Sequence, residues 1–100
     1  MLKLDLYPVP HPQVAGRVVD GEAVIILSES NLVNVYNPVG SRVWELCDGT
    51  RTVEDVIDLI VSEYEVNRER AQADVVAFIE QLLVDRVLEL SEVKSPPAPA

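Results

Sequence analysis

Cys47, Asp48 and His11 are the side chains in this sequence best suited to chemistry. Cys47 is the only cysteine among 100 residues, and it stands directly before Asp48-Gly49. A reactive thiolate needs a neighbouring base or cation to lower its pKa, and no His or Lys lies near Cys47 in the sequence. We therefore interpret Cys47 as a buried structural residue and Asp48-Gly49 as a tight turn between helices.

The remaining side chains do not assemble into another catalytic or cofactor-binding pattern. His11 is the only histidine and lies between two prolines, whereas a zinc site needs several ligands. The four glycines form no phosphate-binding loop, and the carboxylates are spread along positions that face solvent. One cysteine excludes an internal disulfide and is compatible with a reducing compartment. We expect no catalytic residue, no cofactor and no metal.

The charge and hydropathy of the chain limit its partners. Its net charge is -9, from 17 acidic and 8 basic residues, so it should repel nucleic acid phosphates. No apolar run approaches the roughly 20 residues of a membrane span. The first ten residues, "MLKLDLYPVP", lack the pattern of a secretory signal. These features predict a cytoplasmic protein that contacts neither nucleic acid nor membrane.

Proline and charge divide the chain into three parts. Residues 1–13 carry three closely spaced prolines and should form an extended N-terminal arm over the surface rather than an inner strand. Residues 14–90 alternate between strand and helix patterns and should form one domain. Residues 91–100 end in "SPPAPA" and are predicted to be a disordered tail.

The first half of the domain has the pattern of an antiparallel sheet. Asp20-Gly21 is a strong hairpin signal between strands at 14–19 and 22–27, and a third strand follows at 32–36. The second strand is the most apolar and should be central. The third strand should then lie at an edge of the sheet.

The second half has the pattern of three helices. Asn37 and Pro38 can begin the first, with Val39, Val43, Leu46 and Cys47 on one face, and Gly49 should end it. Thr52 and Asp55 can cap the second, and Asn67 can cap a third over 68–86. A short strand, "VLEL", can close the chain. We predict an α+β, winged helix-turn-helix-like fold, with a three-stranded antiparallel sheet followed by three helices.

The third strand and the third helix together predict a peptide-binding groove. The strand "LVNVY" carries no charge, proline or bulge to protect its edge, so a peptide could pair with it. The third helix has an apolar arc wider than a packing stripe needs, which includes Ala71, Val75, Phe78 and Leu82. Alternatively, the helix is wedged within the core, or the arm or a second copy of the chain covers the strand edge.

The sequence from Val35 to Val66, "VYNPVGSRVWELCDGTRTVEDVIDLIVSEYEV", followed by "DVVAFIEQLLVDRVLEL", resembles the PqqD-like family of peptide-recognition domains. Two departures are visible: Tyr36 stands where Leu is usual, and Asp85-Arg86 replaces a Lys/Asp-Gly pair. The resemblance implies a winged-helix-like fold. It also implies that the chain is a non-enzymatic recognition element for ribosomally synthesised, modified peptides (a RiPP recognition element). Such a domain binds the leader segment of a ribosomal precursor peptide and presents it to a modifying enzyme.

The resemblance also implies where the leader binds. The family's leader lies along the third strand and against the third helix, so the peptide-binding residues implied here are Leu32, Val33, Asn34, Val35, Tyr36, Ala71, Asp74, Val75, Phe78 and Leu82. Trp44, in contrast, is expected to pack in the core.

The modifying enzyme would be a radical SAM protein of a quinone-cofactor (PQQ biosynthesis) pathway or the leader protease of a lasso-peptide pathway. Two other functions remain open. The first is a winged-helix DNA-binding regulator, although the acidic third helix argues against it. The second is a dimerisation module that forms a homodimer through the same strand edge.

Overall fold

The computed structural model describes residues 2–28 and 32–96 and, at Leu32, the backbone alone. It contains five strands and three helices within these residues, in agreement with the predicted α+β class. Their bounds are β1 Tyr7–Pro10, β2 Val14–Val19, β3 Glu22–Leu27, β4 Leu32–Val35, α1 Pro38–Leu46, α2 Val53–Tyr64, α3 Arg68–Val84 and β5 Leu88–Ser91.

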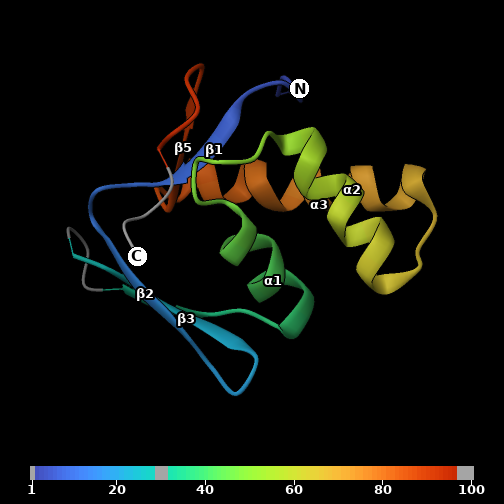
Figure 1. Ribbon diagram of the computed structural model, residues 1–100. Coiled ribbons are helices and arrows are strands. Elements are labelled where there is room, and N and C mark those ends of the chain that lie inside the picture. Colours follow the sequence, from blue (N-terminus) through green and yellow to red (C-terminus); the bar gives the residue numbers. More distant parts are fainter. Residues whose placement is uncertain (1, 29–31, 97–100) are drawn as a thin grey trace.

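The strands form two separate sheets, which corrects the prediction of a single three-stranded sheet. One sheet is antiparallel with the order β2-β3-β4, as predicted, and the other pairs β1 with β5. Residues 7–10 therefore form a strand that pairs with the end of the domain (Figure 1). The winged-helix likeness, and the division into arm, domain and tail, remain predictions. Residues 97–100 of the predicted tail lie outside the described residues.

Alternating prolines explain how β1 can pair at all. Pro8 and Pro10 lack a backbone N–H, and the His11 N–H donates to the Val87 carbonyl at 2.9 Å. Because the N–H groups of successive strand residues point to opposite sides, the two prolines face away from β5. The missing donors therefore cost β1 no hydrogen bond to its partner.

The helices begin where the sequence predicted. The side chain of Asn37 accepts a hydrogen bond from the Gly40 N–H, and Thr52 and Asp55 form a capping box. The side chain of Asn67 accepts from two N–H groups of the first turn of α3. α3 ends at Val84, two residues before its predicted end, and Arg86 then takes the left-handed conformation with φ 60°.

The core lies where α1, α2 and α3 meet the inner face of β2-β3-β4 and the β1-β5 pair (Figure 1). α1 packs on β3, α2 packs on α3, and α3 contacts β5. Burial of these apolar side chains is the main stabilising contribution to the fold. The core residues are Ala23, Ile25, Leu27, Val43, Leu46, Cys47, Val53, Val56, Ile57, Ile60, Ala71, Val75, Val76, Ile79, Leu82, Val87 and Leu88.

Candidate functional site

β4 lies at an edge of its sheet, and no described strand pairs with its outer side. In the N-terminal arm, residues 7–10 pair with β5, and Leu4 and Leu6 bond to the start of α2, so this part of the arm does not cover the edge. An edge strand presents a row of backbone donors and acceptors to any chain that can lie beside it. The open strand edge that the sequence predicted is therefore present, and peptide binding along it stays a prediction.

The register of the sheet identifies the backbone groups that face this open edge. The Tyr36 N–H donates to the Ala23 carbonyl at 3.0 Å, and Asn34 is paired with Ile25. Residues of an antiparallel strand alternate between facing their partner and facing away. The N–H and C=O groups of Val33 and Val35 therefore point outward, available to a further strand.

The side chains of β4 divide between the two faces of the sheet. Val33 and Val35 are 59% and 58% exposed and lie on the outer face, away from the helices. Asn34 and Tyr36 alternate with them and are only partly exposed. The Tyr36 ring contacts the Phe78 ring of α3 edge-on, with 5.3 Å between their centres. β4 is thereby joined to the third helix, as the sequence predicted.

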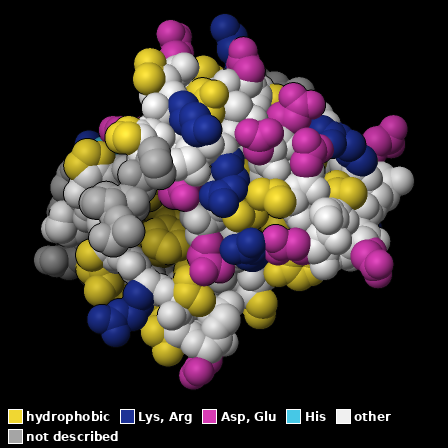
Figure 2. All heavy atoms as spheres, viewed as in Figure 1, with side chains coloured by type: hydrophobic (Ala, Val, Ile, Leu, Met, Phe, Trp, Pro, Cys, Tyr) yellow, Lys and Arg dark blue, Asp and Glu magenta, His cyan; other side chains and the backbone are white. Residues whose placement is uncertain are grey.

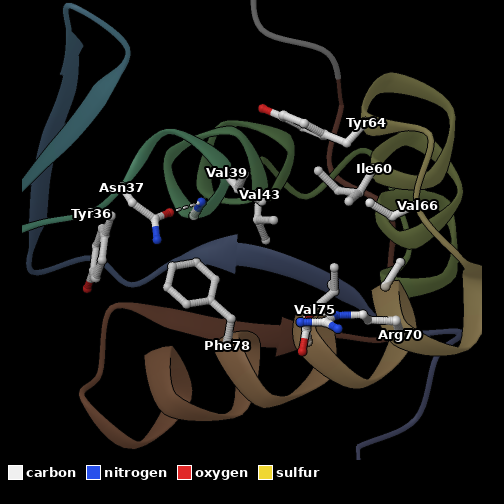
Figure 3. Close-up of a pocket in the computed structure, with 13 residues that line it drawn as sticks. Tyr36, Asn37, Val39, Val43, Ile60, Tyr64, Val66, Arg70, Val75 and Phe78 are labelled. Carbon is white, nitrogen blue, oxygen red and sulfur yellow. Dashed lines mark hydrogen bonds and ion pairs between the residues drawn. The ribbon is translucent and has the colours of Figure 1, made fainter.

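An open groove of about 530 Å³ begins at the end of β4. It runs between α1 and α3 to the turn that joins α2 and α3, with Tyr36 at one end and Tyr64 and Val66 at the other (Figure 3). Its lining residues are Tyr36, Asn37, Val39, Gly40, Val43, Ile60, Tyr64, Val66, Arg70, Ala71, Asp74, Val75 and Phe78.

Gly40 and Phe78 set the shape of the groove near β4. Phe78 points from α3 toward α1 (Figure 3), and a Cβ atom on Gly40 would lie 3.1 Å from its ring. A side chain at position 40 would therefore require the ring to shift. The absence of a side chain at Gly40 lets α1 and α3 approach while Phe78 lies between them.

The charged groups of the groove lie at its rim. The Arg70 Nε atom is 3.6 Å from Asp74 Oδ2, and both side chains are largely exposed. An exposed pair of this kind contributes little to stability. Burial raises the pKa of the Tyr36 hydroxyl, so this group stays neutral at physiological pH. The interior of the groove therefore suits apolar side chains, with one charge of each sign at its edge.

The structure brings together most of the predicted site residues, but not all. Tyr36, Ala71, Asp74, Val75 and Phe78 line the groove, and the backbone of residues 32–35 forms its neighbouring edge. The side chain of Leu32 is not described. Leu82 is fully buried in the core and does not line the groove. Leu82 lies one turn of α3 after Phe78, and its side chain is in the core instead of the groove.

Sequence reasoning missed the wall that α1 and the end of α2 contribute. Val39 was predicted on the buried face of the first helix, but it is 44% exposed and lines the groove. Tyr64 and Val66 are also partly exposed there, on either side of a left-handed residue, Glu65. In the sequence, this wall is indicated by two large apolar residues, Tyr64 and Val66, on either side of the polar residue Glu65. The other missed lining residues are Asn37, Gly40, Val43 and Ile60.

Cys47 and Trp44 lie apart from the groove. Cys47 is completely buried, and burial, together with Asp48, raises the pKa of its thiol to about 12. The prediction of a structural cysteine is therefore confirmed. Trp44 packs partly buried against the core, next to Gly16.

Among the described residues there is no group of three or more potential metal ligands. No helix in the described ranges is long and apolar enough to cross a membrane.

Figure 2 shows acidic side chains spread over the helical part of the displayed face, with fewer basic ones between them. Their excess agrees with the net charge of -9. Some basic side chains of the described residues are paired with carboxylates: the Arg42 Nε atom lies 2.8 Å from Glu63 Oε1, and Arg68 pairs with Asp58. A duplex with its dense phosphate charge would meet mainly carboxylates on this surface.

Comparisons with known proteins identify the family and the fold of the chain. The model of the family described as "Coenzyme PQQ synthesis protein D (PqqD)" matches residues 22–88. The structure solved as "TbiB1 in Complex with the TbiA(beta) Leader Peptide" has a TM-score of 0.76 and 27% identity, over 81% of this chain and 94% of that one. A comparison with curated proteins found no match.

A second solved structure, "Lasso peptide synthetase B1 complexed with the leader peptide", has a TM-score of 0.75 and 20% identity. The alignment covers 83% of this chain and 98% of that one, and at this identity it supports the fold alone. The family model spans both the edge strand and all three helices. On this match, which covers two thirds of the sequence, the chain belongs to the PqqD family.

Proposed function

We propose that this protein binds the leader segment of a ribosomally made precursor peptide and presents it to a modifying enzyme. As a member of the PqqD family it is non-catalytic. In this proposal the leader pairs with β4 as an additional strand, and its apolar side chains enter the groove between α1 and α3. The precursor peptide is thus held while another protein carries out the chemistry.

The observation that carries the proposal is the position of the open edge of β4 directly beside an apolar groove. Val33 and Val35 offer two donors and two acceptors, and the groove begins at Tyr36, the next residue. An extended peptide that pairs with an edge strand gains affinity from its backbone and specificity from pockets for its side chains. The relative at 27% identity was solved with a leader peptide bound, which supports the same ligand class here.

The groove has to supply much of the binding free energy. A disordered leader pays several kcal/mol to become ordered, and a hydrogen bond exchanged with water gains only about 1 kcal/mol net. Pairing along two outward-facing residues would not offset that cost by itself. Burial of apolar leader side chains against Val39, Val75 and Phe78 provides the remainder.

The modifying enzyme would be a radical SAM enzyme of the quinone-cofactor type or a lasso-peptide leader protease. The family model is named for the first pathway, and one of the two solved neighbours is a lasso peptide synthetase. Both pathways require the same step from this chain, namely delivery of a leader.

Fluorescence anisotropy of a labelled leader peptide from a ribosomal precursor of the same organism tests the proposal. The wild-type protein should give saturable binding. Val33→Pro removes an outward-facing N–H and should weaken binding at least tenfold. Val18→Pro is the matched control, because the register also turns the Val18 N–H outward, but on β2 at the opposite edge. It should keep most of the affinity if it remains folded by circular dichroism.

A second pair of variants tests the groove. Phe78→Ala removes a ring that lines it and should also weaken leader binding at least tenfold, whereas Val84→Ala, on an exposed part of α3, should not. A duplex DNA probe is titrated in parallel. DNA binding without leader binding would contradict the proposal and indicate that the protein is a DNA-binding regulator. A mass that doubles with concentration, without leader binding, would instead indicate a dimerisation module.

A further inference from the structure

The hydroxyl group of Tyr36 is buried without a hydrogen-bond partner. Its oxygen is inaccessible to solvent, and no described residue makes a hydrogen bond to it. A buried hydroxyl in this state destabilises the fold, because the hydrogen bonds that it made with water before folding are not replaced. The indole N–H of Trp44 is also unsatisfied, but it lies next to Gly16 of β2 and does not line the groove. Tyr36 is therefore the residue with an unused polar group at the proposed site.

Two polar side chains lie close enough to Tyr36 to influence its hydroxyl. Burial raises the pKa of Tyr36, the Asn34 side chain opposes this rise, and the Asp85 carboxylate adds to it. Asn34 is two residues before Tyr36 on the same face of the strand, and Asp85 is the C-cap of α3. Figure 3 shows the hydroxyl at the far end of the ring, away from Val39 and Val43. It therefore lies beside β4 and the end of α3, outside the apolar part of the groove.

A leader strand that pairs antiparallel with β4 would place one of its side chains opposite Asn34. Because the N–H and C=O groups of Val33 and Val35 face the open edge, Asn34 and the leader residue opposite it form a non-hydrogen-bonded pair. The side chains of such a pair are on the same face of the sheet, with about 4.5–5.5 Å between their Cβ atoms. This leader side chain therefore points toward α3, next to Asn34 and diagonal to Tyr36.

We infer that Tyr36 and Asn34 bind one uncharged polar side chain of the leader, an inference that rests on the proposed leader binding. The side chain is one that both donates and accepts hydrogen bonds, as those of Ser, Thr, Asn and Gln do. It accepts from the Tyr36 hydroxyl and donates to the Asn34 amide oxygen. A Lys or Arg side chain has no acceptor for the hydroxyl hydrogen, and an acidic one is repelled by Asp85 and by the net charge of -9.

The side chains around the hydroxyl can admit this partner. Asn34 is partly exposed and Asp85 is exposed, so both side chains can rotate while the backbone stays in place. The hydroxyl then gains a hydrogen bond and gives up none with water. Such a contact contributes more to affinity than a hydrogen bond that is exchanged with water. The groove accordingly selects apolar leader side chains, and Tyr36 selects a polar one beside them.

Tyr36→Phe tests the inference, because it removes the hydroxyl and keeps the ring. Without leader, its melting temperature by circular dichroism should rise by about 4 °C, since a buried unsatisfied group is removed. Its affinity for the labelled leader peptide, measured by fluorescence anisotropy, should fall about fivefold or more. A role in packing alone would lower both quantities together. Tyr7→Phe, the matched control on β1, should keep the melting temperature within about 1 °C and the affinity within about twofold.

Alanine substitutions along the same leader peptide identify the residue that is bound. One polar leader residue should cost about fivefold in affinity for the wild type and almost nothing for Tyr36→Phe. Unchanged leader affinity in Tyr36→Phe, or no leader position coupled to it, would overturn the inference and leave leader binding confirmed. A melting temperature of free Tyr36→Phe that does not rise would also overturn it, because the hydroxyl would then already have a partner. If the wild type binds no leader, the proposed function fails and this inference fails with it.

Discussion

Ser41 connects α1 to the strand that carries the proposed site. Its buried hydroxyl accepts a hydrogen bond from the Ala23 N–H at 2.5 Å and donates one to the Tyr36 carbonyl at 3.1 Å. In a regular ladder these two backbone groups would bond directly, because the Tyr36 N–H already bonds to Ala23. The hydroxyl is inserted between them and fixes the end of β4 against α1.

Ser41→Ala should lower the free energy of unfolding by about 1–3 kcal/mol, because it leaves a buried N–H and a buried carbonyl without their partner. Ser62→Ala, at an exposed position of α2, should change it by less than about 0.5 kcal/mol. Urea denaturation followed by circular dichroism measures both. An equal decrease in the free energy of unfolding in the two variants would show that the hydrogen bonds of Ser41 contribute nothing to stability.

Cys47 should be inert in the folded protein. Its pKa of about 12 keeps the thiol protonated at pH 8, and the side chain is inaccessible. A thiol-reactive chromogenic disulfide should therefore label the native protein at least a hundredfold more slowly than the protein in guanidinium chloride. Because the folded pKa lies above the ordinary value of 9.0, the stability from burying the neutral thiol is complete below pH 9 and is lost between pH 9 and 12. Rapid labelling of native protein at pH 8 would contradict this assignment.

At the scale of elements, the N-terminal arm supports the start of α2. The carbonyls of Leu4, Leu6 and Pro8 accept hydrogen bonds from the N–H groups of Glu54, Val53 and Gly49. The first N–H groups of a helix have no partner within it, so the arm supplies partners that water or side chains would otherwise provide. The hydrogen bond between Pro8 of β1 and Gly49 extends this contact along the arm and holds the turn between α1 and α2 in place.

Pro8→Asp tests this role, because Pro8 is buried whereas Pro12 is exposed. A carboxylate at the buried position should lower the free energy of unfolding by about 3 kcal/mol or more. The matched Pro12→Asp should lower it by less than about 0.5 kcal/mol. Thermal unfolding by circular dichroism compares the two. If both variants melt like the wild type, the arm is not part of the folded unit.

At the scale of the whole molecule, net charge opposes association through the exposed apolar residues on the outer side of the β2-β3-β4 sheet, which include Val19, Ile26, Val33 and Val35. The charge of -9 disappears as the pH falls toward the ordinary carboxyl pKa values near 4, while the exposed apolar residues remain. We expect the mass of a single chain at pH 7.5 and low salt, and reversible self-association at pH 4.5. Sedimentation velocity measures both, with circular dichroism to verify that the fold persists.

Ile26→Lys should suppress this association at pH 4.5, and Val84→Lys should suppress it less, although both add the same charge. Equal suppression by the two variants would indicate an effect of charge alone. A stable wild-type dimer at pH 7.5 would contradict the view that repulsion keeps the chains apart.

Local chemistry in the sequence was sufficient to predict most individual elements. Asp20 and Gly21 both take positive φ at the predicted hairpin, and Thr52-Asp55 forms the predicted capping box. Turn and cap preferences depend on a few adjacent residues, so they can be read without knowledge of the fold. The edge position of β4 and the burial of Cys47 followed from the same kind of pattern.

Tertiary structure alone decided which distant segments meet. Nothing near Tyr7–Pro10 indicated that its partner would be Leu88–Ser91, about eighty residues later. Nor did any local pattern place Val39, Tyr64 and Val66 on one groove, or Leu82 in the core below it. An apolar residue on a helix has the same sequence signature whether it faces the core or a groove. The sequence by itself therefore determined the elements and the family, and the packing of three helices against two sheets determined the shape of the site.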